Sequence, residues 1–271
     1  MRGTAKKSTA LRVGGTTIRL PGKDGLEVCP AITHTCQQRY AGFADVESLA
    51  SEGISHEIAV LVTKDELADA LHDRHRSRDD SDRAWAALEP YVAEHGRTSY
   101  ERGELTIARM NVEEFPVARQ RDLREGWFYW LDAIDGDTAV AGEVADRLVD
   151  DEGTFALLDG SLFYIRGVSV HPAFQGQQIG ARLVAHGLWA LHRSTGDVAI
   201  LLAKPSKNAF TGEESRCGVR DIRRLARYYE RMGFERSAPE ERIRAGEPVT
   251  MHLLLGEFRL PFQSLGTMGI D

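Results

Sequence analysis

The chain has 271 residues, of which 42% are hydrophobic and 28% charged, so we expect one large globular domain or one domain with an extension. The formal net charge of −7 argues against a nucleic-acid binder that works through bulk positive charge. No apolar run approaches the roughly 18 residues that cross a bilayer, and no apolar segment of a secretion signal follows the basic N-terminus. The three cysteines are too few for a disulfide framework, so we expect a cytoplasmic protein with free thiols.

Residues 1–55 are interpreted as an extension of unknown role. Disorder is expected over the first ten residues, with a short hairpin around Gly14 and Gly15 as the alternative. Residues 26–50 show no clear period.

Three potential metal ligands, Cys29, His34 and Cys36, lie close together in this extension. Their spacing, Cys-x4-His-x-Cys, fits no common zinc finger, and no second ligand pair follows at a helpful distance. We interpret the two cysteines as ordinary thiols and predict no metal site.

A buried strand and two helices are predicted for residues 56–101. The apolar run 58–62 is typical of a buried strand, and Thr63 begins a helix with acidic residues in its first turn. The highly charged run 74–82 is interpreted as a solvated loop. A second helix is predicted over residues 85–96, where apolar side chains recur at helical spacing before a glycine.

Five short elements are predicted for the next part of the chain. Residues 105–110 alternate as in a strand, and residues 115–125 favour a short helix. Residues 127–131 are four aromatics and a leucine, which we interpret as a compact strand. Residues 132–137 form an acidic turn, and residues 138–149 carry apolar side chains at helical spacing.

The stretch from residue 163 to residue 192 is the centre of the sequence. It predicts a buried strand ending before Pro172, a polar turn that contains glycine, and a helix. The N-terminus of a helix exposes backbone N–H groups that have no partner inside the helix. Together with the helix dipole, these groups predict a site for a phosphate or another anion.

The last elements alternate between strand and helix. Gly196 is suited to end the central helix, and residues 198–203 are an apolar run typical of an interior strand buried on both faces. A polar loop follows over 205–217. Asp221 is expected to cap a helix that runs to Met232, and residues 249–255 predict a final strand.

Three motifs in this order resemble a known family. They are Val168-Ser-Val-His-Pro172, Gln175-Gly-Gln-Gln-Ile-Gly-Ala181 and Arg227-Tyr-Tyr-Glu-Arg-Met-Gly-Phe234. From about residue 160 to residue 256, the chain resembles the acyl-CoA-binding half of a GCN5-related N-acetyltransferase (GNAT). The resemblance implies an α/β fold with a mixed, mostly antiparallel central sheet flanked by helices. The predicted division is an extension at 1–55, a helical segment at 56–101, the acetyltransferase domain at 102–260 and a tail at 261–271.

The resemblance also implies a function. It is acetyl-CoA-dependent transfer of an acetyl group to a primary amine by direct attack on the thioester. Acetyl-CoA is the implied cosubstrate, with no metal, no nucleic acid and no membrane as partner. The acceptor is expected to be a small-molecule or peptide amine, and a homodimer is a candidate assembly. The extension is a candidate cover for the acceptor site or a candidate dimer contact.

Site residues carry over by matching motif positions. Tyr229 matches the family's general acid, which protonates the leaving thiolate. The implied cofactor-binding residues are Val168, Ser169, Val170, Gln175, Gly176, Gln177, Gln178, Ile179, Gly180 and Ala181. Gln178 departs from the family because a glycine is expected there, and this departure favours a second interpretation slightly. That alternative is a non-catalytic acyl-CoA-binding module with a regulatory or interaction role.

Two groups of charged residues are left with open interpretations. Candidate general bases are Glu143, Asp132, His171 or a water chain, and Asp132, Asp135 and Asp137 are candidates to attract a cationic amine or form a solvated turn. Six arginines follow helical spacing near the site: Arg216, Arg220, Arg223, Arg224, Arg227 and Arg231. They are either phosphate ligands for CoA or a solvated face balanced by Glu213, Glu214, Glu230 and Glu235.

Overall fold

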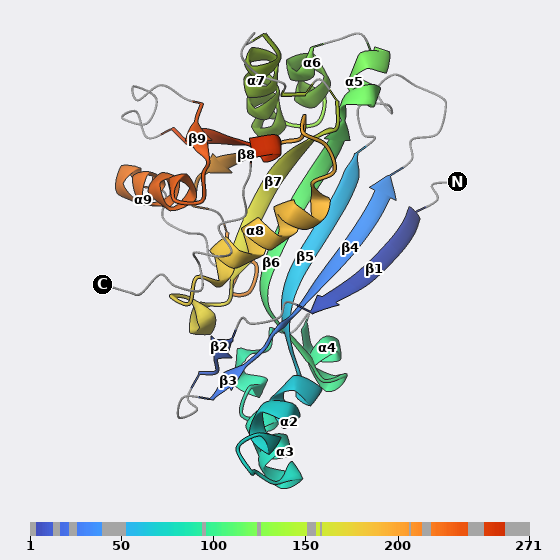
Figure 1. Cartoon of the computed structure of the whole chain (residues 1–271). Helices are drawn as coiled ribbons and strands as arrows, with labels where there is room; N and C mark the ends of the chain where they lie inside the picture. The colour runs from blue at the N-terminus through green and yellow to red at the C-terminus, as the bar shows by residue number, and fades with distance from the viewer. Residues whose placement is uncertain are drawn as a thin grey trace.

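The computed structural model describes residues 4–12, 17–21, 26–39, 53–93, 96–123, 126–150, 156–157, 159–205, 207–212, 218–237 and 247–257. These residues form one large sheet with helices on both faces, and a small second sheet (Figure 1). The α/β class and the mostly antiparallel sheet flanked by helices are therefore confirmed.

The large sheet contains eight strands. In chain order they are β1 (Thr4–Arg12), β4 (Ala31–Arg39), β5 (Ile54–Thr63), β6 (Glu104–Pro116), β7 (Ser161–Val170), β8 (Val198–Ala203), β9 (Glu235–Arg236) and β10 (Val249–Leu254). Their spatial order is β1-β4-β5-β6-β7-β8-β10-β9. Only the central β7–β8 pair is parallel; the other pairs in this sheet are antiparallel. The two-stranded sheet joins β2 (Ile18–Arg19) to β3 (Glu27–Val28).

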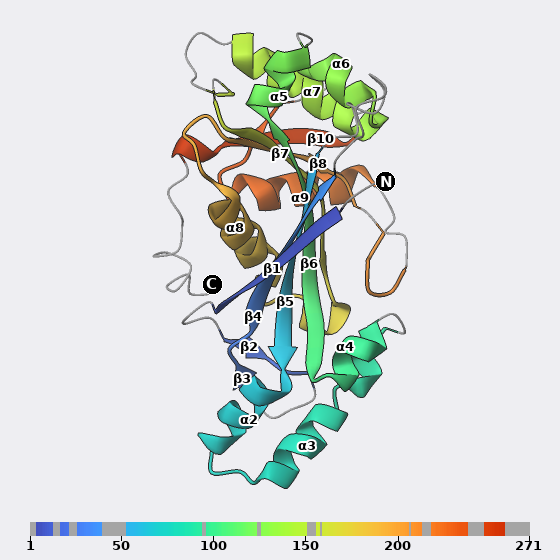
Figure 2. The same ribbon diagram turned by 90° about the vertical axis from the view of Figure 1, so that its right-hand side faces the viewer.

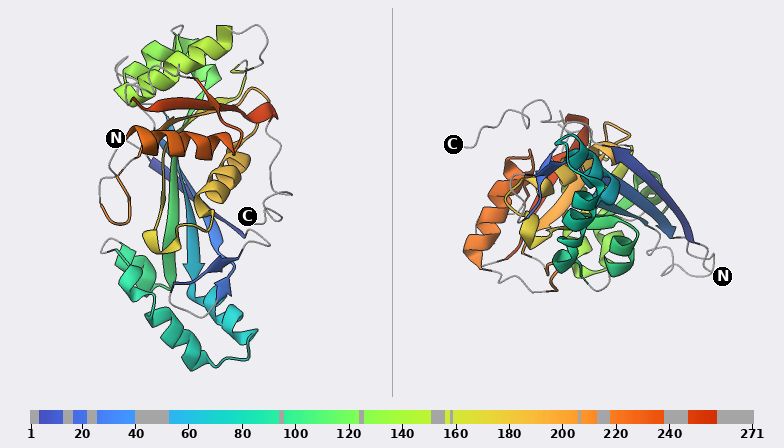
Figure 3. Two further views of the ribbon diagram at one scale, coloured as in Figure 1. Left: turned by 90° about the vertical axis from the view of Figure 1, so that its left-hand side faces the viewer. Right: turned by 90° about the horizontal axis from the view of Figure 1, so that it is seen from below.

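Helices cover both faces and both ends of the large sheet. One face carries α8 (Ile179–Leu191) and α9 (Val219–Glu230), which lie beside each other (Figure 3). The other face carries α5 (Val117–Leu123), α6 (Trp127–Asp132) and α7 (Gly136–Asp150) at one end (Figure 2). At the opposite end lie α2 (Lys64–His72), α3 (Arg78–Ala86) and α4 (Arg97–Glu101) (Figure 1). Short 3-10 turns occupy Glu89–Tyr91, Pro172–Phe174 and Leu255–Glu257.

The predicted aromatic strand at 127–131 is wrong, because these residues form α6. Trp127, Trp130 and Leu131 fall on one helical face and are buried in the core beneath α7. The Asp146 carboxylate accepts hydrogen bonds from the backbone N–H groups of Trp127 at 2.8 Å and Phe128 at 3.0 Å. A partner on α7 thus satisfies the first turn of α6, and this overrides the strand preference of aromatic residues.

The charged run 74–82 is only partly a loop. Ser77 caps α3, and Asp80 completes a capping box, so the helix begins at Arg78 inside the charged run. The predicted second helix also ends early, at Ala86, and continues as a 3-10 turn. Gly96 does not end a helix but precedes the first residue of α4.

The predicted disorder at the N-terminus is wrong for the residues described there. β1 pairs with β4 along nine residues, from Thr4 opposite Arg39 to Arg12 opposite Ala31. Gly14 and Gly15 lie outside the described residues. β1 and β4 extend the same sheet as β5 to β8, so the first 55 residues contribute two strands to the central layer. The predicted tail at 261–271 also lies outside the described residues.

The remaining elements agree with the sequence apart from their ends. β5 and β6 are longer than predicted, while α7, β8 and β10 match closely. α9 begins after Gly218 rather than at Asp221, and Gly233 follows it with a φ of +95°. Gly196 does not end α8, which stops at Leu191. Among the described residues, no helix is long and apolar enough to cross a membrane, and no group of three or more potential metal ligands gathers.

Candidate active site

A cleft opens where β7 and β8 separate. The two strands pair from Leu162 opposite Val198 to Ile165 opposite Leu201, and the pairing stops there. β7 continues to Val170 along its other neighbour, β6. The gap becomes a cleft of about 830 Å³, walled by both strands, the start of α8 and one side of α9. A separation of parallel strands exposes backbone groups that a ligand can pair with.

The turn between β7 and α8 presents backbone N–H groups to this cleft. Gly176 has a φ of +82°, and α8 begins after Gln178 with no side-chain hydrogen bond to its cap. Gln175, Gly176, Gln178, Ile179 and Gly180 line the cleft. The first turn of this 13-residue helix therefore lines a cavity without a side-chain cap from Gln178, and among its N–H groups that of Ala181 donates to a hydroxyl on α9. This arrangement suits an anion.

Eight of the ten residues predicted to bind the cofactor line the cleft, and two do not. Gln177 turns away, and its side-chain amide pairs with the backbone of Arg19 in β2. Ala181 directs its N–H to the hydroxyl of Tyr228 on α9. Both residues help to hold the turn in place, and neither lines the cleft.

Gln178 adopts the left-handed conformation that favours glycine. Its φ is 57° and its ψ is 17°. A non-glycine residue pays roughly 1–2 kcal/mol for this conformation because its Cβ approaches the next carbonyl oxygen. The departure from the family motif thus carries a conformational cost, while the backbone of the turn keeps the shape a glycine would give it.

Tyr229 lies at the inner wall of the cleft. It is only 8% exposed, and its ring contacts Tyr228 and Phe234 with centroid separations of 5.4 and 5.7 Å. Burial raises the pKa of Tyr229, and the neighbouring Tyr228 adds to the shift. Burial likewise raises the pKa of Tyr228 to about 12, opposed by the hydrogen bond from Ala181. Both phenols are therefore neutral proton carriers throughout the physiological range.

Comparison with protein families agrees with this geometry. Residues 127–236 match the model described as an acetyltransferase (GNAT) domain. Residues 127–236 are therefore similar to a GNAT acetyltransferase domain. The matched segment runs from the first residue of α6 to the last residue of β9, and it includes both strands of the cleft, α8 and Tyr229. No curated protein matches the sequence.

The three candidate general bases do not line the cleft of the GNAT domain. Glu143 and Asp132 are exposed on α7 and at the end of α6. His171 accepts a hydrogen bond from the Ala173 N–H at 3.2 Å and lies among the rings of Tyr91, Phe174 and Phe210. His171 thereby caps the 3-10 turn Pro172–Phe174, and burial lowers its pKa, which favours the neutral imidazole.

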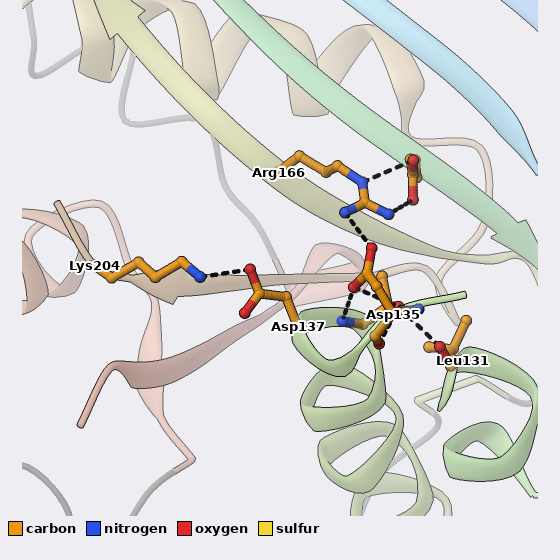
Figure 4. Close-up of polar contacts among 7 residues, drawn as sticks. Leu131, Asp135, Asp137, Arg166 and Lys204 are labelled. Carbon is orange, nitrogen blue, oxygen red and sulfur yellow. Dashed lines mark hydrogen bonds and ion pairs between the residues drawn. The ribbon is translucent and has the colours of Figure 1, made fainter. Parts of the chain in front are cut away.

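Two cations that the sequence motifs did not predict line the inner end of the cleft. Arg166 forms a two-pronged ion pair with Glu113 at 2.7 and 2.8 Å, and a third contact with Asp135 at 2.7 Å (Figure 4). Lys204 pairs with Asp137 at 2.5 Å. Burial alone would lower the pKa of Arg166, but the two carboxylates outweigh it and raise that pKa.

This ionic cluster connects the start of α7 to the middle of β7 and to the residue after β8. The Asp135 carboxylate also accepts the Thr138 N–H at 2.8 Å and so caps the first turn of α7. Asp135 and Asp137 are thus neither a free solvated turn nor unpaired ligands for an amine, while Asp132 is exposed. An arginine within an otherwise apolar strand was the sequence signal for this cluster, because a half-buried guanidinium needs carboxylate partners.

Proposed function

We propose that the protein is an acetyl-CoA-dependent N-acetyltransferase that transfers the acetyl group directly to a primary amine. The observation that carries the proposal is the position of Tyr229, which is buried in the same cleft that the N-terminus of α8 faces. One cavity thus brings together an anion site and a neutral proton donor. The GNAT domain supports acetyltransferase chemistry in general.

The donor would bind along β7 and the turn that follows it. The pyrophosphate meets the N–H groups between Gln175 and Gly180, where the dipole of α8 favours negative charge. The pantetheine arm follows the backbone of Val168 and Val170, which line the cleft. The Val170 carbonyl accepts hydrogen bonds from the side-chain amides of Gln175 and Asn208, so the arm would displace these or pair with other backbone groups. The thioester then lies deeper, toward Tyr229.

The transfer step follows from these positions. The uncharged amine nitrogen adds to the thioester carbonyl carbon, the carbon–sulfur bond breaks, and the sulfur takes the proton of the Tyr229 hydroxyl. The proton lost by the nitrogen returns through water to the tyrosinate. Burial raises the pKa of Tyr229, and desolvation favours the neutral thiol over the thiolate in the same way. The two groups therefore remain matched for proton transfer.

The acceptor is proposed to be a small-molecule or peptide amine. A screen of such amines with acetyl-CoA, detecting the free thiol of CoA, tests the reaction. Donor binding is tested separately by thermal unfolding, since a ligand at 100 times its Kd stabilises the folded state by about 2.7 kcal/mol. Absence of any shift at millimolar acetyl-CoA would overturn the proposal.

A non-catalytic acyl-CoA-binding module is the competing function. The specific observation in its favour is that the candidate bases Glu143, Asp132 and His171 lie outside the cleft wall. It predicts a thermal shift with acetyl-CoA but no thiol release above the uncatalysed rate with any amine of the screen. Thiol release that depends on the amine excludes it.

A further inference from the structure

A second cavity of about 1130 Å³ lies along one side of α9, and arginines line it. We call this surface the arginine stripe; it consists of Arg220, Arg223, Arg224, Arg227 and Arg231. Four of the five are exposed, and Arg223 is half-buried. Such a concentration of positive charge on a chain with a net charge of −7 is a local feature that bulk composition does not explain.

Nearby acids do not balance the stripe within the described residues. Asp221 contacts Arg224 at 3.6 Å, whereas Glu230 is engaged with Arg236 at 2.5 Å and Glu235 approaches His252 at 3.9 Å. Arg220, Arg227 and Arg231 form no ion pair in the part of the chain that the structure describes. Glu213, Glu214 and Arg216 lie outside that part. Three of the five arginines in the stripe therefore have no carboxylate partner among the described residues.

The arginine-lined cavity and the donor cleft share a wall. Asp221, Arg224 and Tyr228 line both. Tyr228 also marks the position of the pyrophosphate turn, because its hydroxyl accepts the Ala181 N–H and lies 3.2 Å from a Cβ built on Gly180. Arg224 is one helical turn from Tyr228, and it lines the same cleft as the turn of the proposed pyrophosphate site.

We propose that Arg224, supported by Arg220, binds the 3′-phosphate of the CoA donor and makes the protein selective for CoA over donors that lack this phosphate. The inference rests on the proposed donor site. CoA carries this phosphate on the ribose beyond its pyrophosphate, and guanidinium groups bind phosphate with charge-assisted hydrogen bonds. The ion pair between Asp221 and Arg224 is long and exposed, so it restrains the guanidinium only weakly. N–H groups of Arg224 therefore remain available to bind the phosphate.

The test measures binding by calorimetry and needs no turnover. CoA and 3′-dephospho-CoA are titrated into the wild-type protein and into Arg224→Gln and Arg231→Gln variants. Arg231 is the matched control, because it belongs to the same stripe but lies seven residues further along α9 and lines only the second cavity. Thermal unfolding without ligand verifies that each variant is folded.

The expected pattern is specific. Wild-type protein should bind CoA about tenfold more tightly than 3′-dephospho-CoA, as one charge-assisted contact predicts. Arg224→Gln should lose most of this preference by weakening CoA binding alone, and Arg231→Gln should retain it. Equal affinity of the wild type for both ligands, or an unchanged preference in Arg224→Gln, overturns the inference while the proposed function stands. Absence of binding to either ligand overturns the proposed function itself, and with it this inference.

Discussion

The side-chain amide of Gln177 pairs with both backbone groups of Arg19, 158 residues earlier in the chain. Its Oε1 accepts the Arg19 N–H at 2.7 Å, and its Nε2 donates to the Arg19 carbonyl at 3.0 Å. The residue that the family motif assigns to cofactor binding thus links the turn before α8 to β2. The first part of the chain thereby supports the turn that lines the proposed donor site.

Removal of this clamp should loosen the turn. Gln177→Ala deletes two exposed hydrogen bonds, so we expect the free energy of unfolding to fall by about 1 kcal/mol. Urea unfolding measures this loss. A variant as stable as the wild type would show that the turn is held without Arg19.

The left-handed conformation of Gln178 predicts an unusual stabilising substitution. Gln178→Gly should raise the free energy of unfolding by about 0.5 kcal/mol, because the relief of left-handed strain exceeds the entropy that glycine adds to the unfolded chain. Gln178→Val should lower it by about 1 kcal/mol or more, since a branched Cβ fits this conformation poorly. Thermal unfolding of both variants decides the point. If glycine destabilised and valine stabilised the protein, the backbone assignment at residue 178 would be wrong.

The close crossing of α6 and α7 depends on Gly142. A Cβ at this position would lie 2.7 Å from both the Trp127 carbonyl oxygen and the Phe128 Cα, which are backbone atoms that cannot turn aside. Gly142→Ala should therefore destabilise the protein by about 1–3 kcal/mol. Gly136→Ala is the matched control on the same helix, because nothing lies within 4 Å of its Cβ and no loss is expected. Equal stability of the two variants would contradict the helix crossing.

A buried polar chain crosses four strands beyond the end of α8 and should make stability depend on pH. His34 Nε2 lies 3.0 Å from His56 Nδ1, His56 Nε2 lies 2.9 Å from Glu114, and the Ser161 hydroxyl donates to Glu114 at 2.8 Å. Burial, together with His56, lowers the pKa of His34 below its ordinary 6.5. Burial would raise the pKa of Glu114, but hydrogen bonds from His56 and Ser161 outweigh it and the pKa falls below 4.5.

Both shifts have the same sign for stability. The folded state binds fewer protons than the unfolded state at each group, so stability is greatest above pH 6.5 and falls as the pH drops below 6.5 through the folded pKa of His34. A second loss begins below pH 4.5. His34→Gln removes the first titration, so the stability gap between wild type and variant should be smaller at pH 5 than at pH 8. A gap that widens toward low pH would contradict the direction assigned to His34.

The part of the fold around the cleft was predictable from sequence because its signals are local. The strand ending at Pro172, the glycine-bearing turn and the helix that ends before Gly233 follow one another in order, and each has a short-range cause. The errors arose where distant partners decide the structure. Asp146 caps residues 127–131 as a helix, and the buried His56 provides a hydrogen-bond partner for the half-buried His34 of β4.

The two cations that line the cleft, Arg166 and Lys204, were not predicted from the sequence for the same reason. Arg166 and Lys204 are separated in sequence from their partners on α7 and β6, and no local pattern brings them together. The same holds for Gln177, whose side chain is indistinguishable in sequence from its neighbour Gln178, although one clamps β2 and the other begins α8.

In the proposed reaction, Tyr229 protonates the leaving thiolate. The most direct measurement is kcat for amine-dependent thiol release in Tyr229→Phe, with the Kd for acetyl-CoA measured alongside. Tyr228→Phe is the matched control, because its hydroxyl bonds the Ala181 N–H at the start of α8 and should affect affinity more than kcat. We predict a kcat about a hundredfold or more below wild type for Tyr229→Phe, with donor affinity within about twofold. A kcat equal to wild type at saturating substrates would remove Tyr229 from the mechanism.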